Sequence, residues 1–122
     1  MTAGSPRARV RVNVLRPLAY GPDMDLSAAR RVVVGVPLSL SGRYGFMGRL
    51  AAAGLEQAID DSRTAGGVMV AGQRRWPELV ILDDMSQRRR VRPCLDALAR
   101  ADLLVGPYGS DLMDEAAAWA AG

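Results

Sequence analysis

Histidine and lysine are both absent from the 122-residue sequence, and all sixteen basic residues are arginine. A chain without lysine cannot build a P-loop phosphate site, a Schiff-base centre or a lysine-dependent phosphorelay site. A chain without histidine cannot by itself assemble Ser/His or Cys/His catalysis or an imidazole metal site. These absences exclude the commonest catalytic centres, and we expect a binding module that uses no metal ion and no cofactor.

Cysteine and long apolar runs are also scarce. The single cysteine, Cys94, permits no disulfide within the chain and says little about the redox compartment. No apolar run approaches the roughly 20 residues that a membrane-spanning helix needs. The first 31 residues hold scattered arginines and no continuous apolar stretch, so they do not read as a secretory signal. We expect either a protein that stays inside the cell or one whose true start lies upstream.

Positive charge is concentrated at the start of the chain. Residues 1–31 hold six arginines and two aspartates, whereas residues 32–122 hold ten arginines and eleven acidic residues, a net charge of −1. We interpret residues 1–31 as a flexible basic arm or linker. The alternative is an edge strand with alternating Val10, Val12 and Val14. We expect the arginines of this arm to be solvated, rather than to contact phosphate, and we predict no nucleic-acid partner.

Apolar runs alternate with helical periodicities through the rest of the chain. Continuous apolar runs predict strands at Val32–Pro37, Glu78–Asp84 and Asp102–Gly106, each followed by a helical pattern. Right-handed crossovers between such units produce a parallel sheet. We therefore predict an α/β fold, a three-layer αβα parallel sheet with strand order 2-1-3, the commonest order for three strands in doubly wound folds.

The first two helices are predicted from the spacing of their apolar residues, and the third from its cap and its early acidic residues. The second helix is expected to begin only near Arg92, because Pro93 disturbs a start at the potential cap Ser86. The third, Asp111–Ala121, has Ser110 as its predicted cap. The first carries an apolar stripe at three- and four-residue steps, made of Met47, Leu50, Ala51, Gly54, Leu55, Ala58 and Ile59.

The predicted strand order places two polar loops side by side at the carboxyl end of the sheet, where open α/β sheets bind ligands. The loop after the first strand supplies Ser41 and Tyr44. The loop after the third strand supplies Tyr108, Gly109 and Ser110. The third helix directs its unpaired amino-terminal N–H groups into the same crevice, so the pattern predicts a site for an anion such as a carboxylate.

Acidic residues near these loops need separate interpretations. Asp111 has to point away if an anion binds beside it. Asp83 and Asp84 resemble the phosphoacceptor strand end of a receiver, but a receiver also needs an acidic pair after the first strand and a lysine. Asp83 suits a ribose contact in a nucleotide-dependent Rossmann-like enzyme. The glycines after the first strand, Gly42, Gly45 and Gly48, do not spell the G-x-G-x-x-G motif of such an enzyme. Such an enzyme stays the second alternative.

Four segments form a further pattern by their order along the chain. They are GVPLSLSGRYGFMG at Gly35–Gly48, AGLEQAIDDSRTAGGV at Ala53–Val68, ELVILDD at Glu78–Asp84 and DLLVGPYGS at Asp102–Ser110. In order and spacing they resemble the amino-terminal lobe of type I periplasmic solute-binding proteins. The resemblance is to the branched-chain amino-acid and amide binders that serve ABC transporters, the leucine-binding type among them.

The resemblance implies a two-lobed clamp that closes on a small amino acid or amide and partners a transporter permease. It implies that the turn Tyr108–Gly109–Ser110 holds the ligand's α-carboxylate, while Tyr44 and Ser41 line the cleft. It also implies a periplasmic or cell-surface location.

The sequence departs from this family in ways that limit the expectation. It has no second lobe and no fourth strand, so we interpret residues 32–122 as an incomplete lobe and the chain as a fragment or truncated gene. We expect millimolar binding or none from the isolated chain. The third strand is then a bare apolar edge, which predicts self-association. The first alternative is an intracellular sensor of the same fold attached to a signalling protein.

Overall fold

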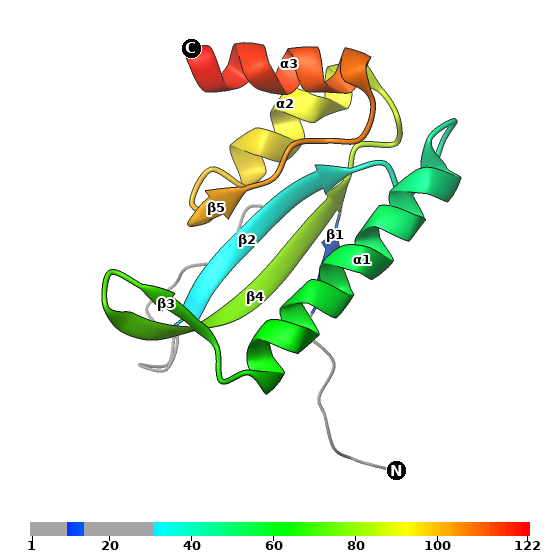
Figure 1. Cartoon of the computed structure of the whole chain (residues 1–122). Helices are drawn as coiled ribbons and strands as arrows, with labels where there is room; N and C mark the ends of the chain where they lie inside the picture. Colours follow the sequence, from blue (N-terminus) through cyan, green and yellow to red (C-terminus); the bar gives the residue numbers. More distant parts are fainter. Residues whose placement is uncertain (1–9, 14–30) are drawn as a thin grey trace.

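The computed structural model of the chain describes residues 10–13 and 31–122. Figure 1 shows strands and helices alternating along the chain, as the sequence predicts. In chain order the elements are β1 (Val10–Asn13), β2 (Arg31–Leu38), α1 (Gly45–Thr64), β3 (Val68–Val70), β4 (Gln73–Asp83), α2 (Arg88–Ala97), β5 (Leu103–Leu104) and α3 (Ser110–Ala121).

The main sheet has the strand order β1-β4-β2-β5, and every neighbouring pair in it is parallel. The three predicted strands correspond to β2, β4 and β5, so the order 2-1-3 is confirmed. The short strand β3 pairs antiparallel with the start of β4 and forms a hairpin that the sequence analysis did not specify. The α/β fold class is confirmed, and the crossovers bring the loops after β2 and β5 to the same edge.

The start of the chain contributes a strand to this sheet. Val10–Asn13 forms β1 and pairs in parallel register with Leu79–Leu82 of β4. These four residues of the proposed arm form an edge strand, because β4 offers them an open ladder of backbone groups. Arg31 is the first residue of β2. Val14 and the remaining residues of the proposed arm lie outside the described part of the chain.

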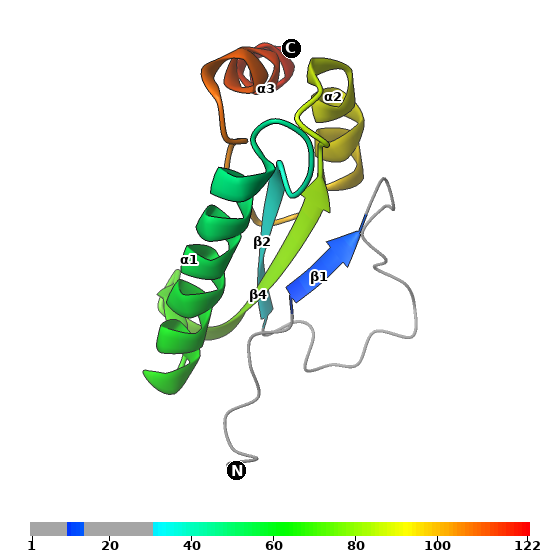
Figure 2. The same ribbon diagram turned by 90° about the vertical axis from the view of Figure 1, so that its right-hand side faces the viewer.

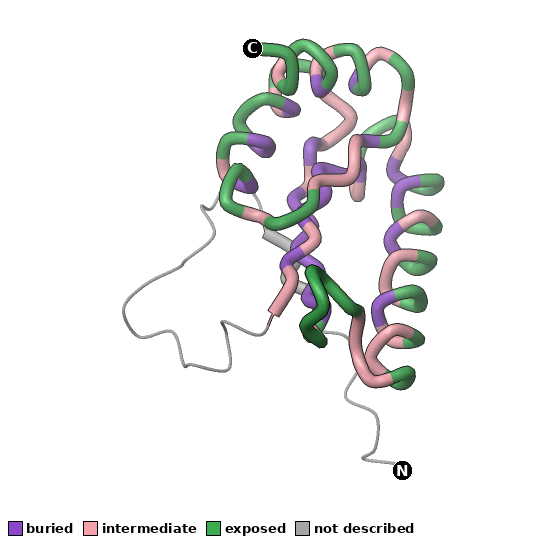
Figure 3. Tube along the Cα trace, turned by 60° about the vertical axis from the view of Figure 1, so that its left-hand side comes forward, coloured by how far each residue is buried: buried purple, intermediate pink, exposed green. Residues whose placement is uncertain are grey.

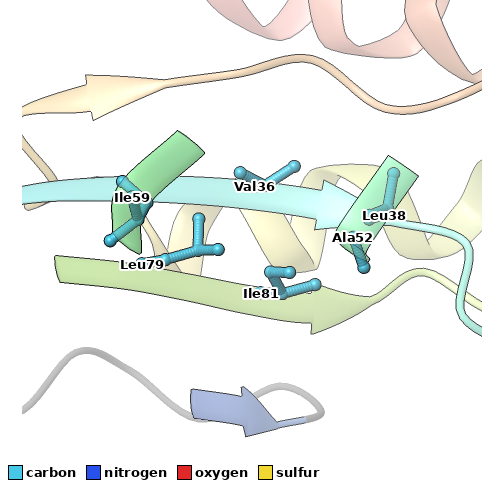
Figure 4. Close-up of a cluster of buried hydrophobic side chains, with 6 residues drawn as sticks. All are labelled: Val36, Leu38, Ala52, Ile59, Leu79 and Ile81. Carbon is cyan, nitrogen blue, oxygen red and sulfur yellow. The ribbon is translucent and has the colours of Figure 1, made fainter. Parts of the chain in front are cut away.

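Helices cover both faces of the sheet, α1 on one face and α2 on the other, with α3 packed beside α2 (Figures 1 and 2). On the α1 face, the alternation of side chains along β2 and β4 produces one buried cluster (Figure 4). Full burial of a Val, Leu or Ile side chain contributes about 1.5–3 kcal/mol. The cluster consists of Val36, Leu38, Ala52, Ile59, Leu79 and Ile81.

The opposite face of the sheet packs more closely against α2. Val33, Val80 and Leu82 point there and meet Cys94 and Leu98. Gly35 also faces this side, and a Cβ added to it would lie 3.1 Å from Leu98. The glycine therefore lets the helix layer approach the sheet.

The apolar stripe predicted for α1 is only partly buried. Figure 3 shows one side of this helix buried and the other exposed. Ile59 is buried and Leu55 is half-buried, but Met47 and Leu50 are exposed by 44% and 54%. The reason is Gly48, where a Cβ would lie 1.6 Å from the carbonyl oxygen of Ser39. The helix rests directly on the backbone of the preceding loop and turns part of the stripe outward; Ala51 is half-buried, and Gly54 and Ala58 are exposed.

The starts of α2 and α3 also differ from the sequence prediction. The helix α2 begins at Arg88 and contains the exposed Pro93, so it does not wait until Arg92. Buried contacts with the sheet and α3 hold it in spite of the missing N–H group. Neither serine is the cap: the N-cap residues are Gln87 and Gly109, and neither makes a side-chain capping bond.

Candidate functional site

Loops after β2 and β5 meet at the carboxyl edge of the sheet, as the strand order requires. The rings of Tyr44 and Tyr108 lie edge to face, with centroids 5.6 Å apart and planes inclined by 68°. Gly109 has a φ of 95°, and a Cβ there would lie 2.9 Å from Cε2 of Tyr44. Three of the predicted site residues are therefore in contact, and Tyr44 packs on the backbone at the start of α3.

Asp111 is turned into this group of residues and does not point away from it, as an anion bound there would require. Its Oδ1 accepts a hydrogen bond of 3.0 Å from the Tyr44 hydroxyl, and its Oδ2 pairs with Nη2 of Arg43 at 2.5 Å. The carboxylate also accepts from the backbone N–H of Leu112. Asp111 thus satisfies part of the amino end of α3 that the sequence analysis assigned to a ligand.

Arg43 is a site residue that sequence reasoning missed. Its guanidinium carbon lies 4.6 Å from the centroid of the Tyr44 ring, a cation–π arrangement. The side chain is 65% exposed, whereas that of Asp111 is 28% exposed. The only signal in the sequence was its place beside Tyr44. We call Arg43, Tyr44, Tyr108, Gly109 and Asp111 the loop cluster.

Ionisation within the loop cluster is set by its hydrogen bonds. The bond to Asp111 is the largest influence that raises the pKa of Tyr44. Desolvation acts to raise the pKa of Asp111, but the bonds from Tyr44 and Leu112 and the charge of Arg43 outweigh it and lower that pKa. At neutral pH the cluster therefore holds a neutral phenol, an ionised carboxylate and a guanidinium.

The predicted residues Ser41 and Ser110 do not join the cluster. Ser41 donates to Oδ2 of Asp83 at 2.7 Å, and its carbonyl oxygen accepts from the Ser86 hydroxyl at 2.7 Å. Ser86 Oγ in turn accepts from the backbone N–H of Tyr44 at 3.1 Å. These bonds tie the loop after β2 to the loop after β4, so Ser41 and Ser86 position Tyr44. Ser110 is the exposed first residue of α3.

The carboxylates of Asp83 and Asp84 accept hydrogen bonds from groups in the loops around them. Asp83 Oδ1 accepts from the backbone N–H groups of Leu40 and Met85, at 3.0 and 2.8 Å. Asp84 is fully buried and its Oδ1 accepts from Ser39 at 2.6 Å, while its Oδ2 has no hydrogen-bond partner among the described residues. Burial raises the pKa of Asp84 against the opposing bond from Ser39. Both oxygens of Asp83 thus already accept hydrogen bonds from groups of the loops.

Within residues 10–13 and 31–122, no group of three or more His, Cys, Asp or Glu side chains is arranged to hold a metal ion. Cys94 is buried, and burial raises the pKa of its thiol to about 12, so it is a thiol and not a thiolate at neutral pH. No helix in the described part of the chain is long and apolar enough to cross a membrane.

Comparisons with known proteins identify the fold. No protein-family model and no curated protein sequence matches the chain. A solved structure that it does match is the branched-chain amino acid transporter substrate binding protein LivJ from Streptococcus pneumoniae, in complex with isoleucine. The TM-score is 0.66 at 24% identity, and the match covers 75% of this chain and 26% of LivJ.

A second match is a substrate-binding periplasmic protein from Ralstonia solanacearum, with a TM-score of 0.61 and 24% identity. It covers 71% of this chain and 24% of that protein. Both matches are to binding proteins, and the chain spans about a quarter of the length of each. The described residues thus have the fold of part of a substrate-binding-protein lobe.

Proposed function

We propose that the chain binds a small amino-acid-like ligand, a branched-chain amino acid or an amide, as part of the substrate-binding protein of an ABC transporter. The observation that carries this proposal is the meeting of Tyr44, Tyr108 and Gly109 at the carboxyl edge of the sheet. Ligands of open α/β sheets bind at this edge, where the strand order changes direction. The likeness to LivJ, whose solved complex contains isoleucine, supports the same choice.

In this proposal the ligand lies against the two tyrosine rings and contacts the exposed Ser110 at the start of α3. Ser41 has a positioning role, because its hydroxyl and carbonyl groups are bound to the loop after β4. No metal or cofactor takes part. A transporter permease is the proposed partner, since LivJ is the substrate binding protein of a transporter.

The proposed affinity of the isolated chain is millimolar or weaker. Two or three charge-assisted hydrogen bonds contribute roughly 1.5–3 kcal/mol each. Association costs an estimated 4–15 kcal/mol in lost translational and rotational freedom, so little net binding energy remains.

Titration of the chain with leucine, isoleucine, valine and small amides tests this proposal, with amide chemical shifts as the readout. We expect shifts that do not saturate below millimolar ligand, and we expect Tyr108→Ala to abolish them. Met69→Ala is the matched control, because Met69 is 61% exposed in the β3 hairpin away from the loop cluster. Saturation at micromolar ligand contradicts the proposed affinity, and equal shifts in both variants contradict the proposed site.

We also propose that the chain self-associates through the free edge of β5. In the described sheet β5 pairs on one side only, with β2, and Leu103 is 55% exposed. A bare apolar edge offers unpaired backbone groups to a second chain.

A further inference from the structure

On the premise of the function proposed above, we propose that the loop cluster recognises the positively charged group of the ligand, an ammonium or guanidinium that takes the place of Arg43. The ligand class is then a primary amine, or a zwitterion that presents its ammonium group to the start of α3. The carboxylate expected at this turn from the sequence would instead meet the carboxylate of Asp111.

The first argument is that the cluster already holds a cation of this kind. The Arg43 guanidinium lies 4.6 Å from the centroid of the Tyr44 ring and pairs with Oδ2 of Asp111. An aromatic face combined with a carboxylate is a pairing of groups that attracts cations, through the ring quadrupole and through direct charge. Arg43 therefore marks the chemistry that the cluster accepts.

The second argument is that the acceptors are held in place and the cation is exposed. Tyr44 is fixed through its backbone N–H by Ser86 Oγ and through its ring by Gly109. Asp111 lies in the first turn of α3. Arg43 is 65% exposed, and exposed ion pairs of this kind contribute little net stability. A ligand cation can replace Arg43 without disturbing the groups that receive it.

The charge at the start of α3 also favours a cation over an anion. Asp111 fills part of the amino end of α3 with its own carboxylate, and its lowered pKa keeps it ionised at neutral pH. The nearby Arg88 is held away from Asp111 by Glu115, whose carboxylate pairs with both Arg88 and Arg92, at 2.9 and 3.0 Å. Once Arg43 is displaced, the cluster is negative, and it repels an anion and attracts a cation.

Two compounds that each retain one charged group of leucine test the two groups separately. Isopentylamine retains the ammonium group, and 4-methylpentanoate retains the carboxylate. We would titrate each, and leucine, into the full chain at neutral pH and follow the backbone amide shifts of Gly109 and Asp111.

We expect isopentylamine to shift these signals and 4-methylpentanoate to leave them unchanged. Arg43→Ala removes the internal competitor and should tighten amine binding by up to about fivefold, the factor that corresponds to an exposed ion pair. Arg89→Ala is the matched control, since Arg89 is an exposed arginine of α2 that bonds Gln87. It should change nothing.

Asp111→Asn should abolish amine binding, and Tyr44→Phe, which keeps the ring, should weaken it while the rest of the spectrum stays folded. Amine binding that survives Asp111→Asn overturns the inference. So does a shift with 4-methylpentanoate alone, although that result leaves the proposed function intact. A response to the amine but not to leucine supports the inference and contradicts the proposed function. If isopentylamine shifts none of these signals in Arg43→Ala, the inference is also overturned.

Discussion

Gly48 is the residue on which the placement of α1 depends. A Cβ there would lie 1.6 Å from the carbonyl oxygen of Ser39, whereas a Cβ at Gly54 would have no neighbour within 4 Å. We predict that Gly48→Ala lowers the free energy of unfolding by about 3 kcal/mol, the upper end of the usual overpacking cost. Gly54→Ala should raise it by about 1 kcal/mol, because alanine is the better helix former. Urea unfolding of both variants checks this, and similar effects of the two would contradict the packing described.

The contact between Tyr44 and Tyr108 was predictable from the strand order, because parallel strands end at one edge and their order makes the two loops neighbours. The orientation of Asp111 was not predictable in this way. It depends on Arg43, a residue 68 positions earlier in the chain, whose side chain completes the ion pair.

Asp84 gives the stability a defined pH dependence. Burial raises its pKa in the folded chain, so the ionised form is disfavoured there relative to the unfolded chain. This loss of folding stability is absent below the pKa that an aspartate has in the unfolded chain, about 3.9. It develops as the pH rises from there through the raised pKa of Asp84 in the folded chain. Asp84→Asn retains an oxygen acceptor for Ser39 and removes the charge. We predict that its stability relative to the unmodified chain increases from acid to neutral pH.

The measurement for Asp84 is the free energy of unfolding across this pH range. The matched control is Asp114→Asn, because Asp114 is exposed on α3. If the free energies of unfolding of Asp84→Asn and the unmodified chain differ by the same amount at every pH, the charge of Asp84 does not destabilise the folded chain.

Among the elements, α3 has a start that differs from the sequence prediction for a reason of backbone geometry. The predicted cap Ser110 is already helical, and Gly109 takes the cap position with a φ of 95°. This angle, and the 2.9 Å approach of the Tyr44 ring to a Cβ position, were not readable from local sequence, since they need the loop after β2 in place. The existence of α3, by contrast, was predicted from its early acidic residues, Asp111, Asp114 and Glu115.

Gly109→Ala and Gly72→Ala compare a glycine at this contact with one in open space. Both glycines have a positive φ, 95° and 77°, which strains alanine, and the ψ of 133° at Gly109 lies outside the left-handed helical region and adds to the cost there. Only Gly109 has the Tyr44 ring against it. We predict a larger loss of stability in Gly109→Ala, together with shifted ring signals of Tyr44 and Tyr108 by NMR. Equal losses and unchanged ring signals would mean that α3 and the loop after β2 are not in contact.

For the whole molecule, the free edge of β5 predicts a concentration-dependent assembly. Sedimentation equilibrium over a range of chain concentrations should show association, and Leu103→Lys should reduce it by placing a charge at the apolar edge. Met69→Lys is the control, because Met69 is equally exposed on the β3 hairpin. A monomer at every concentration, or equal association of both variants, would contradict assembly through this edge.

At the same scale, the sheet explains why so much of the fold was predictable. Alternating strands and helices leave few topologies open, and right-handed crossovers reduce them further. The sequence left the strand β1 open as an alternative, and the hairpin of β3 lay beyond this reasoning. The places of both short segments depend on the edges of β4.

In the function proposed above, the ligand binds where the loops after β2 and β5 meet. A residue-by-residue map of backbone amide shifts, recorded as leucine is added to the full chain at millimolar concentrations, tests it most directly. We predict that the largest shifts occur at Tyr44, Tyr108, Gly109, Ser110 and Asp111. Shifts confined to other parts of the chain, such as the β3 hairpin, would contradict the claim.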